Sequence, residues 1–224
     1  MLKNNEKFAT GEFYHIYNRG VDKRDIFSDE VDLSRFFQSM ELFNTVQPIG
    51  SIYEKKFSDN RFGRPTSKSD GLVEFICFCL NPNHFHFILK QVIDGGISEF
   101  MKRLGGGYTK YFNERNKRTG ALFQGRFKSI HVDSNDYLLH LSAYVNLNNR
   151  VHRFGRPTPK LTKSSWDEYN GRSNGGFCEK DIILDQFGGI NEYKIYAESS
   201  LEDILQRRAI VDVEEEGILE YLLE

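Results

Sequence analysis

The sequence has few cysteines and no long hydrophobic run. Its 224 residues include three cysteines, two of which, Cys77 and Cys79, lie two positions apart in an apolar segment. This odd set suits neither a disulfide framework nor a zinc ribbon, so we expect reduced thiols in a core. No stretch of about 18 apolar residues occurs, and residues 1–7 lack the apolar centre of a secretory signal. These absences predict a soluble, cytoplasmic protein without a membrane partner.

The composition also argues against a disordered chain. Hydrophobic residues make up 39% of the sequence and aromatic residues 14%, which is enough apolar material to bury a core. The length fits one domain of ordinary size, or one domain with an appendage.

The net charge of −2 is the sum of two unlike parts. Residues 1–165 carry 25 Lys and Arg against 17 Asp and Glu, whereas residues 166–224 carry 5 against 15. We therefore expect a basic domain over 1–165 and an acidic C-terminal extension over 166–224. A basic body is typical of nucleic-acid-binding proteins, although charge alone is weak evidence. The extension has enough apolar residues to dock, and its acids, Glu214–Glu216 among them, are expected to compete with a nucleic acid for the cations of the body. The alternatives are a solvated helical appendage and a protein-binding module.

Two histidines lie two residues apart in the apolar run from Leu80 to Lys90. Because the side chains of a strand alternate, His84 and His86 share one face while Phe85 and Phe87 share the other. The run before it, Val73–Leu80, is β-prone, and the intervening Asn-Pro-Asn favours a turn, so a central hairpin is predicted. Two neighbouring imidazoles form half of a metal site or bind a phosphate. The alternative is a pair of surface histidines on an edge strand.

The remaining patterns predict the order strand, helix, strand, strand, helix, strand, followed by one more helix. The expected ranges are strands over 11–18, 72–80, 84–91 and up to Val132, and helices over 32–46, 97–112 and 135–149. Residues 48–71 are predicted to form a loop. This order indicates an α+β, ferredoxin-like βαββαβ sandwich, an antiparallel sheet with its helices packed on one face. The additional helix must then lie near the sheet, and the extension is expected to be mostly helical.

Two local patterns stand out inside these elements. Gly105-Gly106-Gly107 falls within a predicted helix, where each glycine is unfavourable, so we expect a kink, a break or a close backbone approach. Arg126 and Lys128 alternate with Phe127, which predicts a cationic face opposite an apolar one. Such interleaving is found in grooves for single-stranded nucleic acid, and also on ordinary edge strands.

The last predicted helix carries a tyrosine and a carboxamide on one stripe. With Ser134 or Asp133 as its cap, Tyr137, Leu141, Tyr144 and Asn148 follow at helical spacing. A tyrosine on such a helix is most often a core residue. Tyr137 and His140 are interpreted as packing or supporting residues. Separately, the hexamer Arg-Phe-Gly-Arg-Pro-Thr occurs at 61–66 and again at 153–158, either as two basic arms that touch DNA or as a slipped duplication.

Four segments together resemble the HUH-type single-tyrosine transposases of insertion sequences, most closely the REP-associated tyrosine transposases. They are residues 14–20, residues 81–86, residues 120–128 and residues 144–149. The resemblance covers residues 10 to about 170. It implies a ferredoxin-like fold, a divalent metal, Mg²⁺ or Mn²⁺, bound by His84 and His86, and Tyr144 as the nucleophile. Asn148 matches the position of a polar third ligand, although the family usually has Asn-Pro where this chain has Asn148-Asn149.

The expected function is therefore a metal-dependent endonuclease and strand transferase for single-stranded DNA. It would act at hairpin or palindromic DNA through a 5′-phosphotyrosine intermediate, with Arg19, Phe123, Arg126 and Lys128 as DNA-binding residues. The alternative is a catalytically silent DNA-binding protein of the same fold that acts on repeat sequences. A metal-dependent RNA hydrolase would not need the tyrosine. The pattern leaves open whether the active site forms within one chain or in a homodimer.

Overall fold

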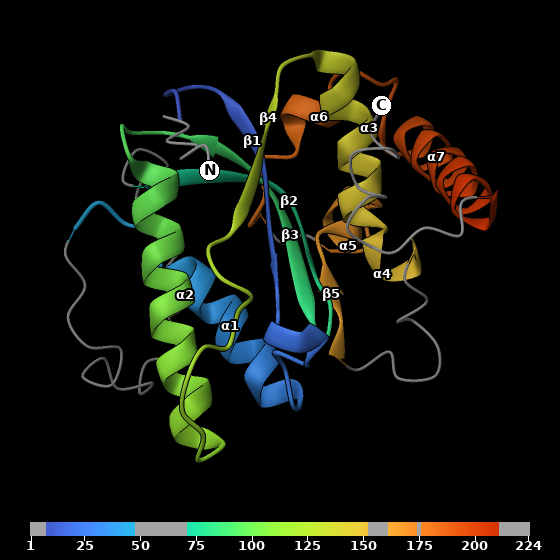
Figure 1. The fold of residues 1–224 in the computed structure, drawn as a ribbon. Coiled ribbons are helices and arrows are strands. Elements are labelled where there is room, and N and C mark those ends of the chain that lie inside the picture. Colours follow the sequence, from blue (N-terminus) through green and yellow to red (C-terminus); the bar gives the residue numbers. More distant parts are fainter. Residues whose placement is uncertain (1–7, 48–70, 152–160, 174–175, 211–224) are drawn as a thin grey trace.

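The computed structural model describes residues 8–47, 71–151, 161–173 and 176–210 (Figure 1). The expected loop, apart from Gly71, and both copies of the repeated hexamer lie outside these residues.

A five-stranded antiparallel sheet forms the centre of the described structure, with strand order β4-β1-β3-β2-β5. Its strands are β1 (Phe13–Arg19), β2 (Val73–Leu80), β3 (His84–Gln91), β4 (Lys128–Val132) and β5 (Lys163–Ser164). The two central strands, β1 and β3, pair over their whole length, with Tyr17 opposite His86 and Arg19 opposite His84. The first four strands thus have the arrangement expected of a ferredoxin-like sheet, and β5 adds an edge to β2.

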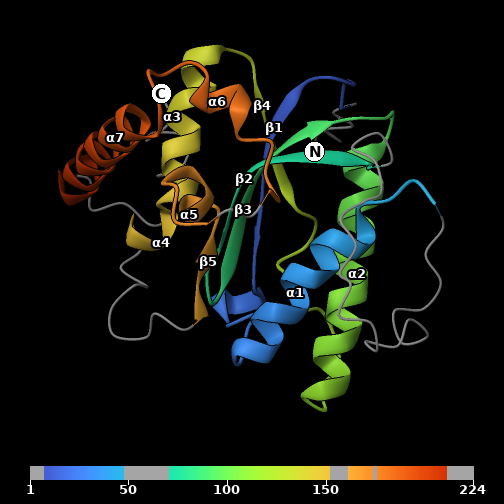
Figure 2. The same cartoon turned by 180° about the vertical axis from the view of Figure 1, so that it is seen from behind.

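The helices cover both faces of this sheet (Figures 1 and 2). On one face lie α1 (Glu30–Phe43) and α2 (Gly96–Arg115), which contact each other. On the other face lie α3 (Asn135–Asn146), α4 (Asn148–Val151), α5 (Trp166–Tyr169) and α7 (Ile190–Ile210). The short helices η1 (Val21–Lys23) and α6 (Asp181–Leu184) complete the set. The predicted α+β class is confirmed, with the additional helix α3 on the face opposite α1 and α2.

Side-chain alternation along β3 divides its residues between these two layers. Phe85 and Phe87 point toward α1, where their ring centroids lie 5.5 and 6.5 Å from that of Phe36. His86 points the other way, and its ring centroid lies 5.6 Å from that of Tyr144 on α3. The phenylalanines anchor the strand in the core, and this packing fixes the direction in which the histidines face.

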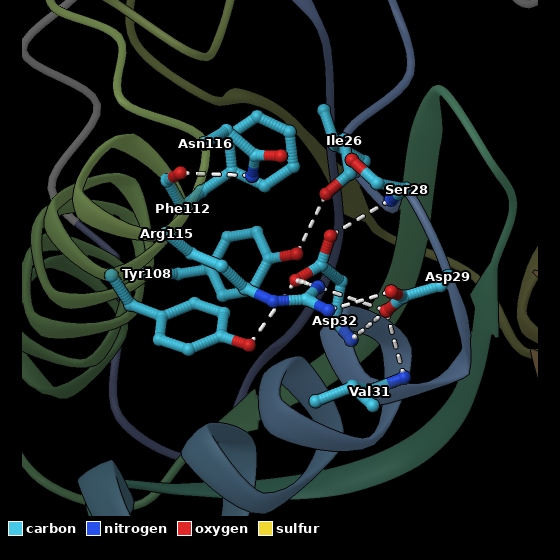
Figure 3. Close-up of polar contacts among 10 residues, drawn as sticks. Ile26, Ser28, Asp29, Val31, Asp32, Tyr108, Phe112, Arg115 and Asn116 are labelled. Carbon is cyan, nitrogen blue, oxygen red and sulfur yellow. Dashed lines mark hydrogen bonds and ion pairs between the residues drawn. The ribbon is translucent and has the colours of Figure 1, made fainter.

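A polar network joins the beginning of α1 to the end of α2 (Figure 3). Asp29 caps α1 by accepting hydrogen bonds from the backbone N–H groups of Val31 and Asp32. Arg115 donates to both Asp29 and Asp32, and Tyr108 donates to the carbonyl oxygen of Ile26 at 2.6 Å. The Arg115 hydrogen bond is the main cause that lowers the pKa of Asp29 to about 2. Since Asp32 is fully buried, this network fixes how the two helices pack.

Three details differ from the sequence prediction. Helix α2 runs without a break through its three glycines, so of the three alternatives expected there the break does not occur. A close approach does occur, because a Cβ on Gly107 would lie only 2.6 Å from Cζ of Phe43. Helix α3 ends at Asn146, and the chain resumes helical geometry after Leu147, so Asn148 belongs to α4.

The third difference concerns β4. The strand begins at Lys128, so Arg126 and Phe127 precede it. Both of them line one groove on the α2 side of the sheet, and the predicted division into a cationic and an apolar face does not hold. Strand alternation requires extended backbone, and the chain before Lys128 contains a turn at Gly125, whose φ is +70°.

The described part of the acidic extension packs onto the same core as the sheet. Tyr169 and Tyr193 are fully buried, and the Tyr169 hydroxyl donates to the carbonyl oxygen of Ile76 on β2 at 2.8 Å. Tyr193 lies with its hydroxyl 3.0 Å from that of Ser142 and accepts from the amide of Asn146, both on α3. The described part of the extension is mostly helical, as expected, and packs against α3.

The three cysteines are free and buried, which confirms the expectation of core thiols. Burial raises the pKa of Cys77 and of Cys79 to about 12, so neither thiol is reactive at neutral pH. Among the described residues, no helix combines the length and the apolar character needed to cross a bilayer.

Candidate active site between the sheet and helix α3

Five rings gather where β1 and β3 meet α3. The ring centroids of His84 and His86 are 5.2 Å apart, and the edge of Tyr144 approaches His86 at 5.6 Å. On the neighbouring strand, His15 and Tyr17 stack on His86 at 5.2 and 5.6 Å. Residues far apart in sequence thus form one cluster, because β1 and β3 are adjacent and their alternate side chains face α3.

His84 is held by side chains on both of its ring nitrogens. Its Nδ1 lies 2.6 Å from Oδ1 of Asn83, whose Nδ2 donates to the carbonyl oxygen of Lys23. An amide oxygen only accepts, so the ring proton is on Nδ1 and the lone pair is on Nε2. That Nε2 lies 2.9 Å from Nδ2 of Asn81 and 3.1 Å from Oδ1 of Asn148.

The amide of Asn81 fixes the orientation of Asn148. Its Nδ2 donates to Oδ1 of Asn148 at 2.7 Å, and both side chains are fully buried. As a result, His84 Nε2 and Asn148 Oδ1 both contact the same amide nitrogen of Asn81 and lie 3.1 Å from each other. Two ligands at about 2.1 Å from one cation and about 90° apart are themselves about 3 Å apart, so these two atoms have the spacing of a ligand pair.

His86 contacts a second histidine through its Nδ1, which lies 3.0 Å from Nε2 of His15. His15 is completely buried, and this burial lowers its pKa to about 3, so it is neutral. Its other nitrogen, Nδ1, has no hydrogen-bond partner among the described residues, and the same holds for Nδ2 of Asn148. Buried polar atoms without partners are uncommon in folded proteins, and here both belong to the candidate site.

Tyr144 lies beside the histidines but is almost inaccessible. Only 2% of its surface is exposed, and its ring approaches His15 and His86 edge-on at 6.4 and 5.6 Å. Its helix begins at Ser134, whose hydroxyl caps it by accepting from the N–H of Tyr137. Burial is the main cause that raises the pKa of Tyr137 to about 12, which agrees with its interpretation as a packing residue.

The residues predicted to bind DNA are divided between two places. Lys128 lies on the histidine side, with Nζ 6.0 Å from the centre of the Tyr17 ring. Phe123 and Arg126 line the groove on the α2 side. Arg19, at the end of β1, donates through Nε to Oε1 of Gln124. The structure therefore brings His84, His86, Tyr144 and Asn148 together, with Lys128 close by, and places Phe123 and Arg126 apart from them.

Three residues of the cluster were not among the sequence-predicted site residues. His15 and Tyr17 show the same two-residue spacing as His84 and His86, and they too lie in a β-prone segment. That spacing could have placed them on one face, but not next to His86, since the pairing of β1 with β3 is a long-range contact. Asn81 was interpreted only as a turn residue, although its amide connects His84 to Asn148.

The donor set suits a divalent cation. Among the described residues there is no cluster of three His, Cys, Asp or Glu side chains placed to hold a metal. The candidate set contains two imidazoles and a carboxamide, and its two unpartnered polar atoms lie in the same cluster. Neutral imidazole nitrogens and amide oxygens are ordinary ligands for Mn²⁺, and amide oxygens also for Mg²⁺.

Comparison with known proteins finds a family that part of the chain resembles. Residues 66–148 match the sequence profile of a family described as Y1_Tnp, transposase IS200 like. A solved structure titled as that of a REP-associated tyrosine transposase bound to a REP hairpin is similar over 79% of this chain and 90% of its own, with 12% identity and a TM-score of 0.48. No curated protein matches the chain. The matched segment contains His84, His86, Tyr144 and Asn148.

Proposed function

Because residues 66–148 match the IS200-like transposases, we propose that this protein is a transposase that cuts and joins single-stranded DNA beside a hairpin. The observation that carries the proposal is the 3.1 Å contact between His84 Nε2 and Asn148 Oδ1, with Tyr144 beside His86. All four residues lie in the matched segment. The basic character of residues 1–165 supports DNA as the substrate.

We propose that His84, His86 and Asn148 hold a divalent cation, Mg²⁺ or Mn²⁺. Such an ion would polarise the scissile phosphate and stabilise the charge that develops on its oxygens. Asn83 orients the ring of His84, and the Nδ2 of Asn81 contacts both His84 Nε2 and Asn148 Oδ1, so a cation bound by these two atoms would take the place of that amide. His15 orients His86 in a similar way. If His86 binds the cation through Nε2, its ring proton is on Nδ1, and His15 Nε2 accepts the hydrogen bond from it.

Tyr144 is the proposed nucleophile. Its hydroxyl oxygen forms a bond to phosphorus while the bond between phosphorus and the 3′ oxygen breaks. The phenolic proton leaves to solvent or a nearby base, and the departing 3′ oxygen takes up a proton to give a 3′-OH. The 5′ end remains attached to the tyrosine. Because the phenolate is also a good leaving group, a 3′-OH can later attack the phosphotyrosine and reseal or transfer the strand.

One observation favours the alternative of a silent DNA-binding protein. Tyr144 is only 2% exposed, so a phosphate can reach its hydroxyl only after neighbouring groups move. A permanently buried tyrosine would serve packing alone, and the fold would then bind DNA repeats without cutting them. The two functions differ in whether a covalent product forms.

A labelled hairpin oligonucleotide with a single-stranded 5′ segment distinguishes them. Incubated with Mn²⁺, the wild type should give a complex that survives denaturing electrophoresis, and Tyr144→Phe should give none. Tyr137→Phe is the matched control, with the same atom removed from the same helix, and should still form the complex. The His84→Ala variant should lose the complex but bind DNA with affinity within about twofold, because phosphate contacts dominate affinity. A complex formed by Tyr144→Phe, or formed equally in a chelator, would contradict the proposal.

A further inference from the structure

A groove lies on the opposite side of the sheet from the five rings of the candidate site, which we call the tyrosine cluster (His15, Tyr17, His84, His86 and Tyr144). It runs between α2 and the segment before β4, with Phe36 of α1 and Phe85 of β3 at its floor, and its volume is about 760 Å³. This size falls in the range of ordinary ligand sites. In Figure 1, α2 stands on the side of the sheet away from α3 and α7, so the candidate active site does not include this groove.

The groove combines an apolar floor with a cationic rim. Its rings include Phe123, which is nearly buried, and Phe127, which is partly exposed and stacks on Phe8 at 6.2 Å. The charged residues that line it are Lys102, Lys110 and Arg126, and the described lining residues include no carboxylate.

Both lysines pair with carboxylates outside the groove. Lys102 pairs with Glu99 at 3.4 Å and Lys110 with Glu114 at 3.9 Å, in both cases on the exposed surface of α2. Exposed pairs of this kind contribute little to stability, so a phosphate can replace the carboxylates at small cost. Apolar rings with cations at the edge complement a nucleotide, which has an aromatic base and an anionic backbone.

The glycines of α2 give an independent indication. A Cβ on Gly107 would collide with Phe43, which explains that glycine. Gly105 and Gly106 also line the groove, yet a Cβ on either would meet nothing within 4 Å. Glycine is unfavourable in a helix interior, and packing among the described residues gives no reason for these two. They leave open a space that a ligand can fill.

We propose that this groove binds an unpaired nucleotide of the single-stranded DNA, with its base against the phenylalanine rings and its phosphates at Lys102, Lys110 and Arg126. The assignment rests on the proposed function, because it names where part of that substrate lies. The path to the active site is short along the chain. Arg126 lines the groove, whereas Lys128, two residues later on the edge strand β4, lies over Tyr17 on the histidine side. A strand that passes around this edge contacts both cations.

The double variant Gly105→Ala/Gly106→Ala tests the proposal, because alanine should stabilise the helix while its methyl groups narrow the groove. We expect a higher Tm than wild type, together with about tenfold weaker binding of a labelled oligothymidylate of about 12 nucleotides, equivalent to the loss of one stacked base. Fluorescence anisotropy measures the binding. Wild-type affinity in this variant would overturn the proposal. If the oligomeric state also changed, the groove would instead be assigned to contact with a second copy of the chain.

A matched pair of charge variants provides the second arm. Arg126→Gln and Arg172→Gln remove the same charge, but Arg172 is an exposed residue after α5 and does not line the groove. Only Arg126→Gln should weaken oligothymidylate binding, and equal losses in both would overturn the proposal.

These results are separable from the fate of the proposed function. If the wild type forms no covalent complex but the glycine variant still binds more weakly, the groove assignment stands and the transposase chemistry fails. If the covalent complex forms and the glycine variant binds like wild type, the groove assignment fails alone.

Discussion

His15 and His86 form a pair whose meaning depends on which ring nitrogen carries the proton. The contact joins His15 Nε2 to His86 Nδ1 at 3.0 Å in a fully buried position. If His86 donates, its Nε2 lone pair is available to a cation and the proton of His15 is on Nδ1, the atom without a partner. A buried donor without a partner is costly. A chain that keeps it does so for a reason other than stability, and fixing the tautomer of a ligand is such a reason.

This reasoning predicts the effect of changing His15. His15→Leu removes the acceptor and should weaken Mn²⁺ binding by about 10- to 100-fold, the usual effect of losing a hydrogen-bond partner of a ligating histidine. His15→Gln retains an acceptor oxygen and should recover part of the affinity. Isothermal titration with Mn²⁺ measures the affinity, and nitrogen NMR chemical shifts of the histidine rings report the tautomer of His86.

The fold of the His15 variants is checked by circular dichroism. Equal Mn²⁺ affinity in the wild type and in His15→Leu would show that His15 only fills space.

At the residue scale, the sequence predicted the components of the site better than their connections. Strand alternation places His84 and His86 on one face without any tertiary information. Helical spacing predicts Asn148 on the stripe of Tyr144, and the family resemblance adds its role as a ligand. It faces His84 although the helix is interrupted at Leu147. The spacing survives because one residue of altered backbone displaces the next turn only slightly. The contacts of Asn81 and His15 depend on packing between segments more than 60 residues apart in sequence, and no local pattern reports them.

At the scale of elements, the tie between α1 and α2 depends on one arginine. Arg115 forms ion pairs with two carboxylates. One is Asp29, the exposed cap of α1, and the other is Asp32, whose side chain has no exposed surface. Apolar periodicity located both helices but could not show this tie, because Asp32 occupies a position that looks like an ordinary acidic residue of a first helical turn. Removal of the arginine would leave a buried carboxylate with the hydrogen bonds from Ser28 and Tyr111 only.

Arg115→Met should therefore lower the Tm clearly at pH 7, since a buried carboxylate that loses its cationic partner is destabilising. Lys102→Met, which removes an exposed pair on the same helix, should change the Tm very little. Thermal unfolding followed by circular dichroism measures both. A loss no greater than that of Lys102→Met would mean that the network does not hold the helices.

The pH dependence of the same variant follows from Asp29. Its pKa is about 2 in the folded protein against an ordinary value of 3.8, so the folded state favours the ionised form. The stability that this carboxylate contributes is present above about pH 4 and is lost as the pH falls toward 2. The difference in Tm between wild type and Arg115→Met should narrow over that window. A constant difference from pH 5 to pH 2 would exclude Asp29 as a source of the effect.

At the scale of the whole molecule, the two faces of the sheet have different tasks in the proposed reaction. One face carries the tyrosine cluster and the other carries the groove, and the edge strand β4 lies where Arg126 and Lys128 separate. The sequence pattern predicts the order of the elements. It does not predict that Arg126 and Lys128 lie on different sides of the sheet, because the alternation of residues 126–128 looks like that of a regular strand. A turn before Lys128 directs two cations to opposite sides of the sheet.

This arrangement predicts a strong dependence of binding on salt. Each phosphate contact with a single strand contributes a slope of about −0.7 to the logarithm of affinity against the logarithm of salt concentration. Arg126→Gln should therefore reduce the slope by about 0.7, and Lys128→Gln by a similar amount, when a hairpin with a single-stranded segment is titrated. For a fully paired duplex of equal length, the salt slope should be the same in the wild type and in both variants. Identical slopes in wild type and both variants would place the DNA elsewhere.

The acidic extension has two different relations to the basic body. Its described part is built into the core, since Tyr193 hydrogen-bonds α3 and Arg150 pairs with Glu198 of α7 at 2.9 Å. Truncation after about residue 170 would remove these contacts and could not report on charge. Residues 211–224 offer a cleaner test, because they contain six carboxylates and no Lys or Arg. If these acids compete with DNA for the cations of the body, deleting residues 211–224 should raise affinity for non-specific single strands roughly threefold at low salt.

The gain should shrink as salt rises, because salt screens the tail and the DNA alike. Replacing the six acids with their amides in the full-length chain should reproduce the effect of the deletion, since the amides keep the length and bulk of the tail and remove only its charge. Anisotropy titrations at two salt concentrations compare the three proteins. Deletion without any gain at low salt would eliminate competition by the tail, and a gain from deletion that the amides do not reproduce would assign the effect to bulk instead of charge.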